Sequence, residues 1–342
     1  MEIIHYYSEW KMPQEKKSCL IMMASYNGER FIKEQIESII AQTYQNWRLI
    51  IQDDGSTDCT VSMIEQFVKT DPRICMFVND SGKHGPYQNF NALVNKCRNS
   101  VEKHDLYFFA DQDDCWDRDK IEKFIAFYDL HAVEPDKPVL IYGDMRIIDQ
   151  NGIITHESLN SLDKIERTPK SMFFDASVWG CNMMFNRALL MDIQPVSEQS
   201  GRIWGHDQYF ARWAGIRGEL LFFHDICMSY RRYGESVTAE HVFTIDKRRI
   251  LDRLNKLDAL AFDHAVMYKS ALFVIDQLKK ADLSKQEKHT ILGIQRCIEK
   301  GGITAIWYFA VYGIHLGRRV RTASHLFILV LGIYKKHLKE IQ

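Results

Sequence analysis

The chain has 342 residues, of which 46% are hydrophobic and 26% are charged, and its formal net charge is -1. That length is sufficient for a large core and for about two domains of roughly 150 residues each. The balanced charge provides no overall basic field, which argues against nucleic acid as a partner. The eight cysteines form no C-x-x-C pair, as is typical of unpaired thiols in a reducing compartment. Because the first residues lack the apolar core of a signal peptide, we predict a polar leader at 1–17 and a cytoplasmic protein.

Apolar runs and amphipathic stretches alternate in the first part of the chain. Each apolar run predicts a buried strand, and each is followed by residues whose apolar positions recur at helical spacing. The expected strands are 19–24, 47–52, 74–78 and 106–110. This alternation predicts an α/β fold with a mostly parallel, Rossmann-like sheet flanked by helices. From about residue 138 the pattern loosens: 139–149 predicts one further strand, and the part beyond 245 is helical in pattern.

Four acidic or amide residues follow the expected strand at 106–110 directly: Asp111, Gln112, Asp113 and Asp114. Ligands of open α/β sheets gather at the carboxyl ends of the strands. Two carboxylates one residue apart offer hard oxygen ligands for Mn²⁺ or Mg²⁺, which commonly complete their shells with substrate phosphates. The motif therefore predicts a metal site for a nucleotide-like substrate. The alternative is a solvated turn or a helix N-terminus.

Tyr26 and Asp54 follow the first two expected strands. An aromatic ring can stack on a base, and a carboxylate can accept a hydrogen bond from the imide N–H of a pyrimidine. The pair thus fits a pyrimidine nucleotide. The alternative is that Asp54 only stabilises the turn DDGSTD, since Asp, Gly, Ser and Thr are common turn residues.

Three segments, in their order and spacing, carry a resemblance to a known family: 24–58 (beginning ASYNGERF and ending DDGSTD), 108–121 (FFADQDDCWDRDKI) and 205–238 (beginning GHDQYF and ending YRRYGESVT). With them the chain resembles inverting glycosyltransferases of family 2, which have the GT-A fold, and especially the bacterial rhamnosyltransferase-like branch. The resemblance covers roughly residues 18–240.

The resemblance implies a nucleotide-sugar donor and names residues for it. Ala24, Tyr26, Glu29 and Asp54 would hold the nucleotide, Asp111 and Asp113 would bind the metal–diphosphate, and Gln112 between them would contact the nucleotide sugar. It also implies that Asp207, in the pair His206-Asp207, is the base that deprotonates the acceptor. A helix N-terminus can hold such a carboxylate in its anionic form. The alternative for Asp207 is a helix cap, and His206, which departs from the commoner acidic residue, would orient Asp207 or pack.

Further loops near the expected crevice supply weaker candidates. Lys83 could meet the nucleotide and Asn89 could fix the backbone of a loop that contains Gly82 and Gly85; the alternative is an exposed hairpin-like loop. Trp179, with Gly180 and Cys181, resembles the family segment that lines the sugar and acceptor side, and core packing is the rival explanation.

The segment YRRYGESVT offers two arginines. Arg231 and Arg232 could close over the diphosphate with charge-assisted hydrogen bonds, or could form surface ion pairs instead. The family often has His and Asn where this chain has Tyr233 and Ser236, which puts a metal or phosphate role of those two positions in doubt.

The region 241–342 lies beyond the resemblance and is read by itself as helical and membrane-associating. From Gly301 onward it has six Lys or Arg residues against Glu340 alone, and its two apolar runs are shorter than the roughly 18–20 residues that span a bilayer. We predict interfacial helices that place the protein peripherally on the inner face of the cell membrane. The alternative is a helical subdomain packed on the core or on a second subunit.

Together these features predict two halves of a catalytic domain, 18–137 for nucleotide and metal and 138–240 for acceptor and base. The expected function is metal-dependent, inverting transfer of rhamnose or a hexose from a dTDP- or UDP-sugar to a hydroxyl of a glycan intermediate, lipid-linked, in bacterial surface polysaccharide synthesis. The alternatives are a sugar nucleotidyltransferase and a catalytically silent nucleotide-binding protein of the same fold. A dehydrogenase is disfavoured because no G-x-G-x-x-G follows the first strand.

Overall fold

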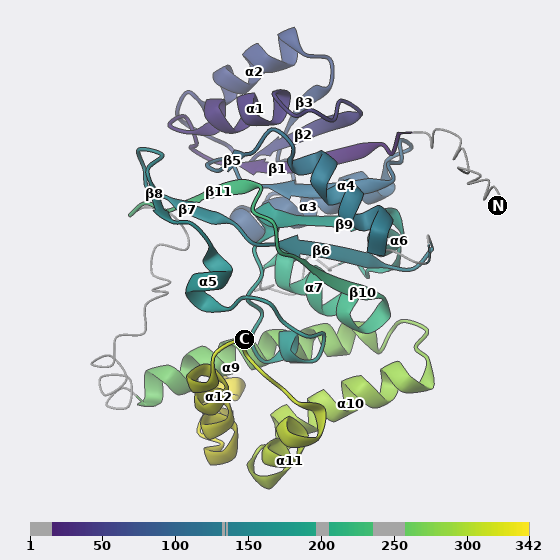
Figure 1. Ribbon diagram of the computed structural model, residues 1–342, viewed down its shortest axis with the longest axis vertical. Helices are drawn as coiled ribbons and strands as arrows, with labels where there is room; N and C mark the ends of the chain where they lie inside the picture. Colours follow the sequence, from purple (N-terminus) through teal and green to yellow (C-terminus); the bar gives the residue numbers. More distant parts are fainter. Residues whose placement is uncertain (1–15, 132–133, 135, 196–204, 235–256, 342) are drawn as a thin grey trace, which may run out of the picture.

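The computed structural model describes residues 16–131, 134, 136–195, 205–234 and 257–341. It shows an α/β body at the top of the view in Figure 1 and a group of C-terminal helices beneath it. Of the predicted polar leader, residues 1–15 lie outside the described residues. Ser236 and the first part of the predicted region 241–342 lie outside them as well.

A seven-stranded sheet forms the centre of the body, in the order β10-β6-β9-β4-β1-β2-β3. All neighbouring strands run parallel except β9, which is antiparallel to both β4 and β6. The strands are β1 (Cys19–Ser25), β2 (Trp47–Asp53), β3 (Ile74–Val78), β4 (Leu106–Ala110), β6 (Val139–Gly143), β9 (Met183–Asn186) and β10 (Glu219–Phe223). Every residue of β4, β6 and β9 is buried, as expected of strands covered on both faces. The prediction of a mostly parallel sheet is confirmed.

A second, four-stranded sheet lies beside the first, in the order β5-β11-β7-β8. Its strands are β5 (Cys115–Trp116), β7 (Arg146–Ile148), β8 (Ile154–His156) and β11 (Met228–Arg231). The single strand predicted at 139–149 is therefore wrong: it divides at Asp144 into β6 and β7, which belong to different sheets. The carboxylate of Asp144 accepts hydrogen bonds from Met145 N, Asn160 N and Ser158 Oγ, and these fix the bend.

The first four helices of the body follow the strands as the sequence predicts, whereas the two short helices at 159–163 and 187–192 were not predicted. They are α1 (Ile32–Ile40), α2 (Thr60–Thr70), α3 (Pro86–Asn99), α4 (Lys120–His131), α5 (Leu159–Asp163), α6 (Arg187–Asp192) and α7 (His206–Arg217). Helix α3 packs on β1 and β2, and α7 packs on β6, β10 and α3. Two helix N-termini are thereby brought to the carboxyl ends of the parallel strands, where the predicted site residues lie.

The C-terminal helices confirm the predicted helical extension. They are α9 (Leu257–Leu278), α10 (Lys285–Lys300), α11 (Gly302–Tyr312), α12 (Arg319–Leu331) and α13 (Lys335–Glu340). Helices α9 and α10 both pack against α7 of the body. Among the described helices, none combines the length and the apolar character needed to cross a bilayer.

A polar cluster ties α12 to the body. Arg321 of α12 forms ion pairs with Asp163 and with Asp175, the second at 3.2 Å. Asp175 also pairs with the buried Arg167 at 2.7 Å. Burial raises the pKa of Asp175, but Arg167 and Arg321 outweigh that effect and lower it to about 2. The ionised carboxylate therefore stabilises the docked helices.

We expect Asp175→Asn to lower the free energy of unfolding by about 2.5 kcal/mol at pH 7, because a shift of roughly two pKa units corresponds to that energy at about 1.4 kcal/mol per unit. The native pKa lies below the unfolded one, so the contribution is present above about pH 4 and is lost as the pH falls through about 2. Urea unfolding at pH 7 and at pH 2.5 should show the deficit of the variant shrinking in acid. Asp276→Asn, which removes an exposed ion pair with Lys279, is the matched control and should change little. An equal deficit at both pH values would contradict the assignment.

Candidate functional site

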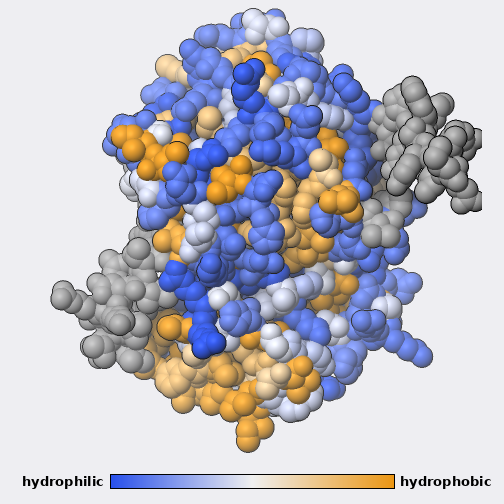
Figure 2. Space-filling model, viewed as in Figure 1, coloured by the Kyte–Doolittle hydropathy of each residue, from blue (hydrophilic) through white to orange (hydrophobic). Residues whose placement is uncertain are grey.

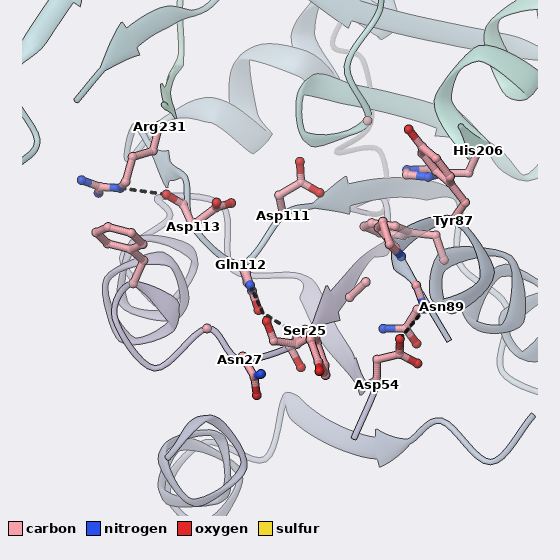
Figure 3. Close-up of a pocket in the computed structure, with 18 of the residues that line it drawn as sticks. Ser25, Asn27, Asp54, Tyr87, Asn89, Asp111, Gln112, Asp113, His206 and Arg231 are labelled. Atoms are coloured by element: carbon pink, nitrogen blue, oxygen red, sulfur yellow. Dashed lines mark hydrogen bonds between the residues drawn. The ribbon is translucent and has the colours of Figure 1, made fainter. Parts of the chain in front are cut away.

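A cavity of about 880 Å³ opens at the carboxyl ends of β1, β2 and β4 and is closed on its other sides by α3, α7 and β11. Figure 3 shows the residues that converge on it. Most of the residues predicted from the sequence line it: Ala24, Tyr26, Asp54, Asn89, Asp111, Gln112, Asp113, Trp179, Asp207 and Arg231. The described lining does not include Glu29, Lys83 or Arg232.

The turn after β2 uses its two aspartates differently. Asp53 is fully buried and accepts hydrogen bonds from Ser25 Oγ and from the backbone of Gly55 and Ser56, so it builds the turn. Asp54 lines the cavity, and its carboxylate accepts from Asn79 Nδ2 at 2.6 Å and from Gly85 N at 2.6 Å. It thereby holds the loop before α3. Both readings of Asp54 have support: it stabilises local structure and it faces the space where a ligand would lie.

Gln112 joins the ends of β1 and β4. Its side-chain amide accepts from Tyr26 N at 2.8 Å and donates to Tyr26 O at 2.9 Å. The backbone of Tyr26 is therefore fixed while its ring, 54% exposed, remains at the cavity wall. A ring presented in this way is available for stacking on a planar group.

Three carboxylates crowd the end of β4. Asp111 and Asp113 line the cavity, whereas Asp114 is fully buried behind them. Burial, with Asp114 and Asp113 as neighbours, raises the pKa of Asp111 well above its ordinary value, and burial next to Asp113 raises the pKa of Asp114 to about 7. Oxygen atoms of Asp111 and Asp114 lie within 4.8 Å of each other and of Cys181 Sγ.

This arrangement fits a divalent cation. Asp114 Oδ2 is buried and has no hydrogen-bond partner among the described residues, and the neighbouring carboxylates repel one another. Hard carboxylate oxygens with unsatisfied negative charge are the ligands that Mn²⁺ and Mg²⁺ select. Because Asp111 and Asp113 are the pair that faces the cavity, they are better placed than Asp114 to share an ion with a bound ligand.

Arg231 and Tyr233 hold this acidic group from the side of β11. Arg231 N donates to Asp114 Oδ1 at 3.0 Å, its Nε donates to Asp113 O at 2.9 Å, and its guanidinium pairs with Glu34 at 2.6 Å. The Tyr233 hydroxyl donates to Asp113 Oδ2 at 2.8 Å. Arg231 is 2% exposed, and its guanidinium is already paired with the half-exposed Glu34. Tyr233, which replaces the His of the family, contacts a predicted metal ligand directly.

Asp207 stands in the first turn of α7 and lines the cavity. Burial raises its pKa to about 6, although backbone hydrogen bonds from Gln208 and Gly180 counteract part of that rise. A Cβ atom on Gly205 would overlap Asp207 Oδ1, so this glycine lets the carboxylate fold back over the helix N-terminus. A carboxylate that titrates near neutral pH suits a general base.

His206 precedes Asp207 and points into the same cavity wall. Its ring stacks on Phe90 with centroids 3.9 Å apart and meets Phe109 edge-on. Neither ring nitrogen has a hydrogen-bond partner within the part of the chain that the structure describes, and burial lowers its pKa to about 3. His206 is therefore a neutral, packed imidazole, and no hydrogen bond connects it to Asp207.

Three further predicted residues also have hydrogen-bond partners within the protein. Glu29 Oε2 accepts from Cys59 N at 2.9 Å, at the start of α2. Asn89 is buried, and its side-chain amide exchanges hydrogen bonds with Gln52, so it fixes α3 to β2. The backbone carbonyl of Lys83 accepts from Asn79 at 2.8 Å, within the loop that Asp54 holds.

The structure adds cavity residues that sequence reasoning missed. Tyr87 in the first turn of α3 lines the cavity, and burial, with the charges of Asp207 and Asp111, raises its pKa. His84 contacts Asp54 at 3.1 Å. Both belong to the segment HGPYQNF, where Pro86 is the first residue of α3; a proline there is a signal for a helix start, but it does not tell which side chains face the cavity.

Known proteins resemble this chain over the same region. The family model for "Glycosyl transferase family 2" matches residues 20–194. A dTDP-rhamnosyl transferase of Shigella flexneri is 31% identical over 50% of this chain and 56% of its own length. A UDP-Glc:alpha-D-GlcNAc-diphosphoundecaprenol beta-1,3-glucosyltransferase of Escherichia coli is 31% identical over 39% of this chain and 48% of its own length. The chain thus spans about half the length of these curated relatives.

Solved structures agree on the fold. TarS of S. aureus, in complex with UDP-GlcNAc, aligns with 94% of this chain and 91% of its own at a TM-score of 0.55 and 15% identity. A mannosyltransferase of Pyrobaculum calidifontis, in complex with GDP-Man and Mn²⁺, aligns with 96% of this chain and 89% of its own at a TM-score of 0.51 and 17% identity. The predicted GT-A fold is confirmed by these likenesses.

We expect a divalent cation that binds the acidic group to release protons. Asp114, whose pKa burial raises to about 7, is partly protonated near pH 7, the pKa of Asp111 is raised as well, and a metal ion binds the anion. Calorimetric titration with MnCl₂ in two buffers of different ionisation enthalpy should give roughly one proton per ion at pH 6.5, with release falling as the pH rises. Asp114→Asn should release fewer protons, and the exposed Asp225→Asn should match the wild type. Release that does not change with pH would contradict this expectation.

Proposed function

We propose, because the chain belongs to glycosyltransferase family 2, that it transfers a sugar from a nucleotide-sugar donor to a hydroxyl group with inversion at the anomeric carbon. The observation that carries the proposal is the convergence of Asp54, the pair Asp111 and Asp113, and Asp207 on one cavity. These are the nucleotide, metal and base positions that the family resemblance assigns.

The donor is proposed to be a dTDP- or UDP-sugar that carries rhamnose or a hexose. The relatives named for dTDP-rhamnosyl and UDP-Glc transfer support this class. The ring of Tyr26 would stack on the pyrimidine, and Asp54 would accept its imide N–H beside Ala24. Gln112 would act by holding Tyr26 in place.

A divalent cation, Mn²⁺ or Mg²⁺, would be held by Asp111 and Asp113. When bound it would act as a Lewis acid that stabilises the charge growing on the leaving diphosphate. The Tyr233 hydroxyl, which donates to the carboxylate of Asp113, and the Arg231 guanidinium, whose Nε donates to the backbone carbonyl of Asp113, would keep Asp113 turned toward the cavity. We propose that Glu29, Asn89 and the loop of Lys83 support the shape of the site without donor contact. The same is proposed for Arg232, whose backbone N–H donates to Ile148 O of β7.

Asp207 is proposed as the general base. In a single in-line displacement its carboxylate takes the proton of the acceptor hydroxyl while that oxygen attacks the anomeric carbon, and the nucleotide diphosphate leaves on the opposite face. One carboxylate suffices because no covalent enzyme intermediate forms. Trp179 and Gly180 line the cavity on the side of Asp207 and would border the sugar and acceptor.

The acceptor is proposed to be a glycan, linked to a lipid carrier, in bacterial surface polysaccharide synthesis. Support comes from the relative whose acceptor is a diphosphoundecaprenol-linked sugar and from a teichuronic acid glycosyltransferase of Bacillus subtilis that is 28% identical over 51% of this chain. In this proposal residues 18–240 form the catalytic domain, with halves 18–137 and 138–240. Residues 241–342 form the part that contacts the membrane surface on its inner face.

The direct test is nucleotide release from a panel of dTDP-, UDP- and GDP-sugars with MnCl₂ and a lipid-linked acceptor. Turnover with one pyrimidine donor that stops on addition of EDTA is the expected result. Release of pyrophosphate from a nucleoside triphosphate and a sugar phosphate would instead identify a nucleotidyltransferase. Nucleotide binding without transfer to any acceptor would indicate a silent protein.

We expect the rate of transfer to rise with pH through an apparent pKa near 6, since Asp207 must be ionised to accept a proton. The raised pKa means that activity is lost as the pH falls through that value. Asp207→Asn should lower kcat by about 10²- to 10⁴-fold with little change in thermal stability or in donor binding. Asp225→Asn, an exposed carboxylate outside the cavity, is the control. Activity of Asp207→Asn close to that of the wild type would remove Asp207 from the mechanism.

A further inference from the structure

A second cavity, of about 370 Å³, lies between α10 and α11 and shares no lining residue with the catalytic cavity. Its lining includes three basic side chains, His289, Arg296 and Lys300, and no acidic one. Within the described part of the chain, neither Arg296 nor Lys300 forms an ion pair, and both are exposed. Unneutralised cations around a hollow are the usual surroundings of an anionic group.

A buried hydroxyl in this cavity also lacks a partner. Tyr308 lines the cavity and is 2% exposed, yet its hydroxyl has no hydrogen-bond partner among the described residues. Buried polar groups are rarely left unpaired, because the lost hydrogen bond with water is not replaced. A phosphate oxygen in the cavity could accept from this hydroxyl and pair with Arg296 and Lys300.

Helix α11 presents an apolar face beside the cavity. The helix GITAIWYFAVY contains no charged residue. Ile303 is 83% exposed, Trp307 57% and Val311 56%, and Ile306 between them is exposed as well. These positions are spaced three and four apart and so share one side of the helix. Trp307 belongs to both features, since it also lines the basic cavity.

Helix α12, which packs against α11, extends this face. Its exposed apolar residues are Val320, Phe327, Val330 and Leu331. Figure 2 shows hydrophobic surface spread over the end of the molecule where α11 and α12 lie. We call the exposed apolar residues of the two helices the apolar face. Contiguous apolar surface of this kind marks a site of association.

The stretch of chain that forms the apolar face carries charged residues of one sign. From Gly301 to Lys339 the chain has Lys and Arg residues but no Asp or Glu. Arg319 at the start of α12 and Lys339 in α13 are exposed, as are Arg296 and Lys300 at the cavity. A helix with apolar residues, a Trp at its boundary and basic neighbours is typical of an element that lies in the interface of an anionic bilayer.

We propose that the apolar face is a docking surface for an anionic phospholipid bilayer, and that the cavity between α10 and α11 receives a phosphate headgroup. Ile303, Ile306 and Trp307 enter the boundary between headgroups and acyl chains, and Arg296 and Lys300 pair with lipid phosphates. A protein partner of the same complementarity would need both a large apolar patch and matching acids. A bilayer with anionic lipid provides both everywhere on its surface. The inference does not depend on the catalytic assignments, although it supplies the site where a lipid-linked acceptor would be met.

The test is co-sedimentation of the full chain with vesicles of phosphatidylcholine alone and of phosphatidylcholine with 30% phosphatidylglycerol. We expect binding to the anionic vesicles to be at least tenfold tighter and to weaken in 0.5 M NaCl. Trp307→Ser should weaken binding to the anionic vesicles about tenfold, and the double variant Arg296→Gln, Lys300→Gln should remove about tenfold of the anionic preference. Brominated lipid should quench tryptophan fluorescence in the wild type, and the quenching should fall in Trp307→Phe.

The matched controls are exposed residues on the body: Val101→Ser, which is 99% exposed, and Lys69→Gln on α2. Both should bind like the wild type. Asp207→Asn should also keep full vesicle binding, so failure of the catalytic proposal is separable from failure of this one. Equal binding to both kinds of vesicle, or equal loss in Trp307→Ser and Val101→Ser, would overturn the inference. A dimer in light scattering that Trp307→Ser dissociates, without vesicle binding, would assign the face to a second copy instead.

Discussion

The crowding of Asp111, Asp113 and Asp114 at the buried end of β4 is the constraint on which the site depends. Buried carboxylates are costly unless other groups compensate them, and here the compensation comes from distant parts of the chain. The buried Lys120 ammonium, which donates to Cys181 O at 2.9 Å, lowers the pKa of Asp114 against the larger effect of burial. Strand β11 brings the backbone N–H of Arg231. The small second sheet thus places a hydrogen-bond donor beside the buried carboxylate of Asp114.

Because the acidic group depends on distant parts of the chain, only part of the fold could be predicted from the sequence. The strands from β1 to β4 and the helices between them were predictable because apolar periodicity is local. The antiparallel β9 was not, since its buried run resembles any short apolar segment and its pairing with β4 and β6 spans more than 40 residues of chain. The division at Asp144 was likewise hidden, because the bend is fixed by Ser158 and Asn160, which the sequence places in a polar stretch.

For the site, the types of the residues predicted which side chains line the cavity better than they predicted which residues those side chains contact. Asp111 and Asp113 line the cavity as predicted because the carboxyl ends of parallel strands share an edge, and Asp207, at a helix N-terminus, was assigned to the same cavity by the family resemblance. The partners of Arg231 and Asn89 could not be read, because Glu34 and Gln52 become neighbours only through packing. Polar residues whose hydrogen bonds are met within the protein hold a site in shape, whereas those with free acceptors can meet a ligand. Only a structure separates the two.

In the first turn of α7, the same buried environment shifts the pKa values of two neighbouring residues in opposite directions. The same burial that lowers the pKa of His206 to about 3 raises that of Asp207 to about 6, because it disfavours the charged form of each. His206 is therefore neutral and a poor proton acceptor at physiological pH, and its unpaired nitrogens can serve a hydroxyl by hydrogen bonding alone. Asp207, with a pKa of about 6, can change between its ionised and protonated forms near neutral pH, as a general base must. Of the two residues, the carboxylate is the one whose proton affinity matches the proposed transfer, and the imidazole beside it offers no competing base.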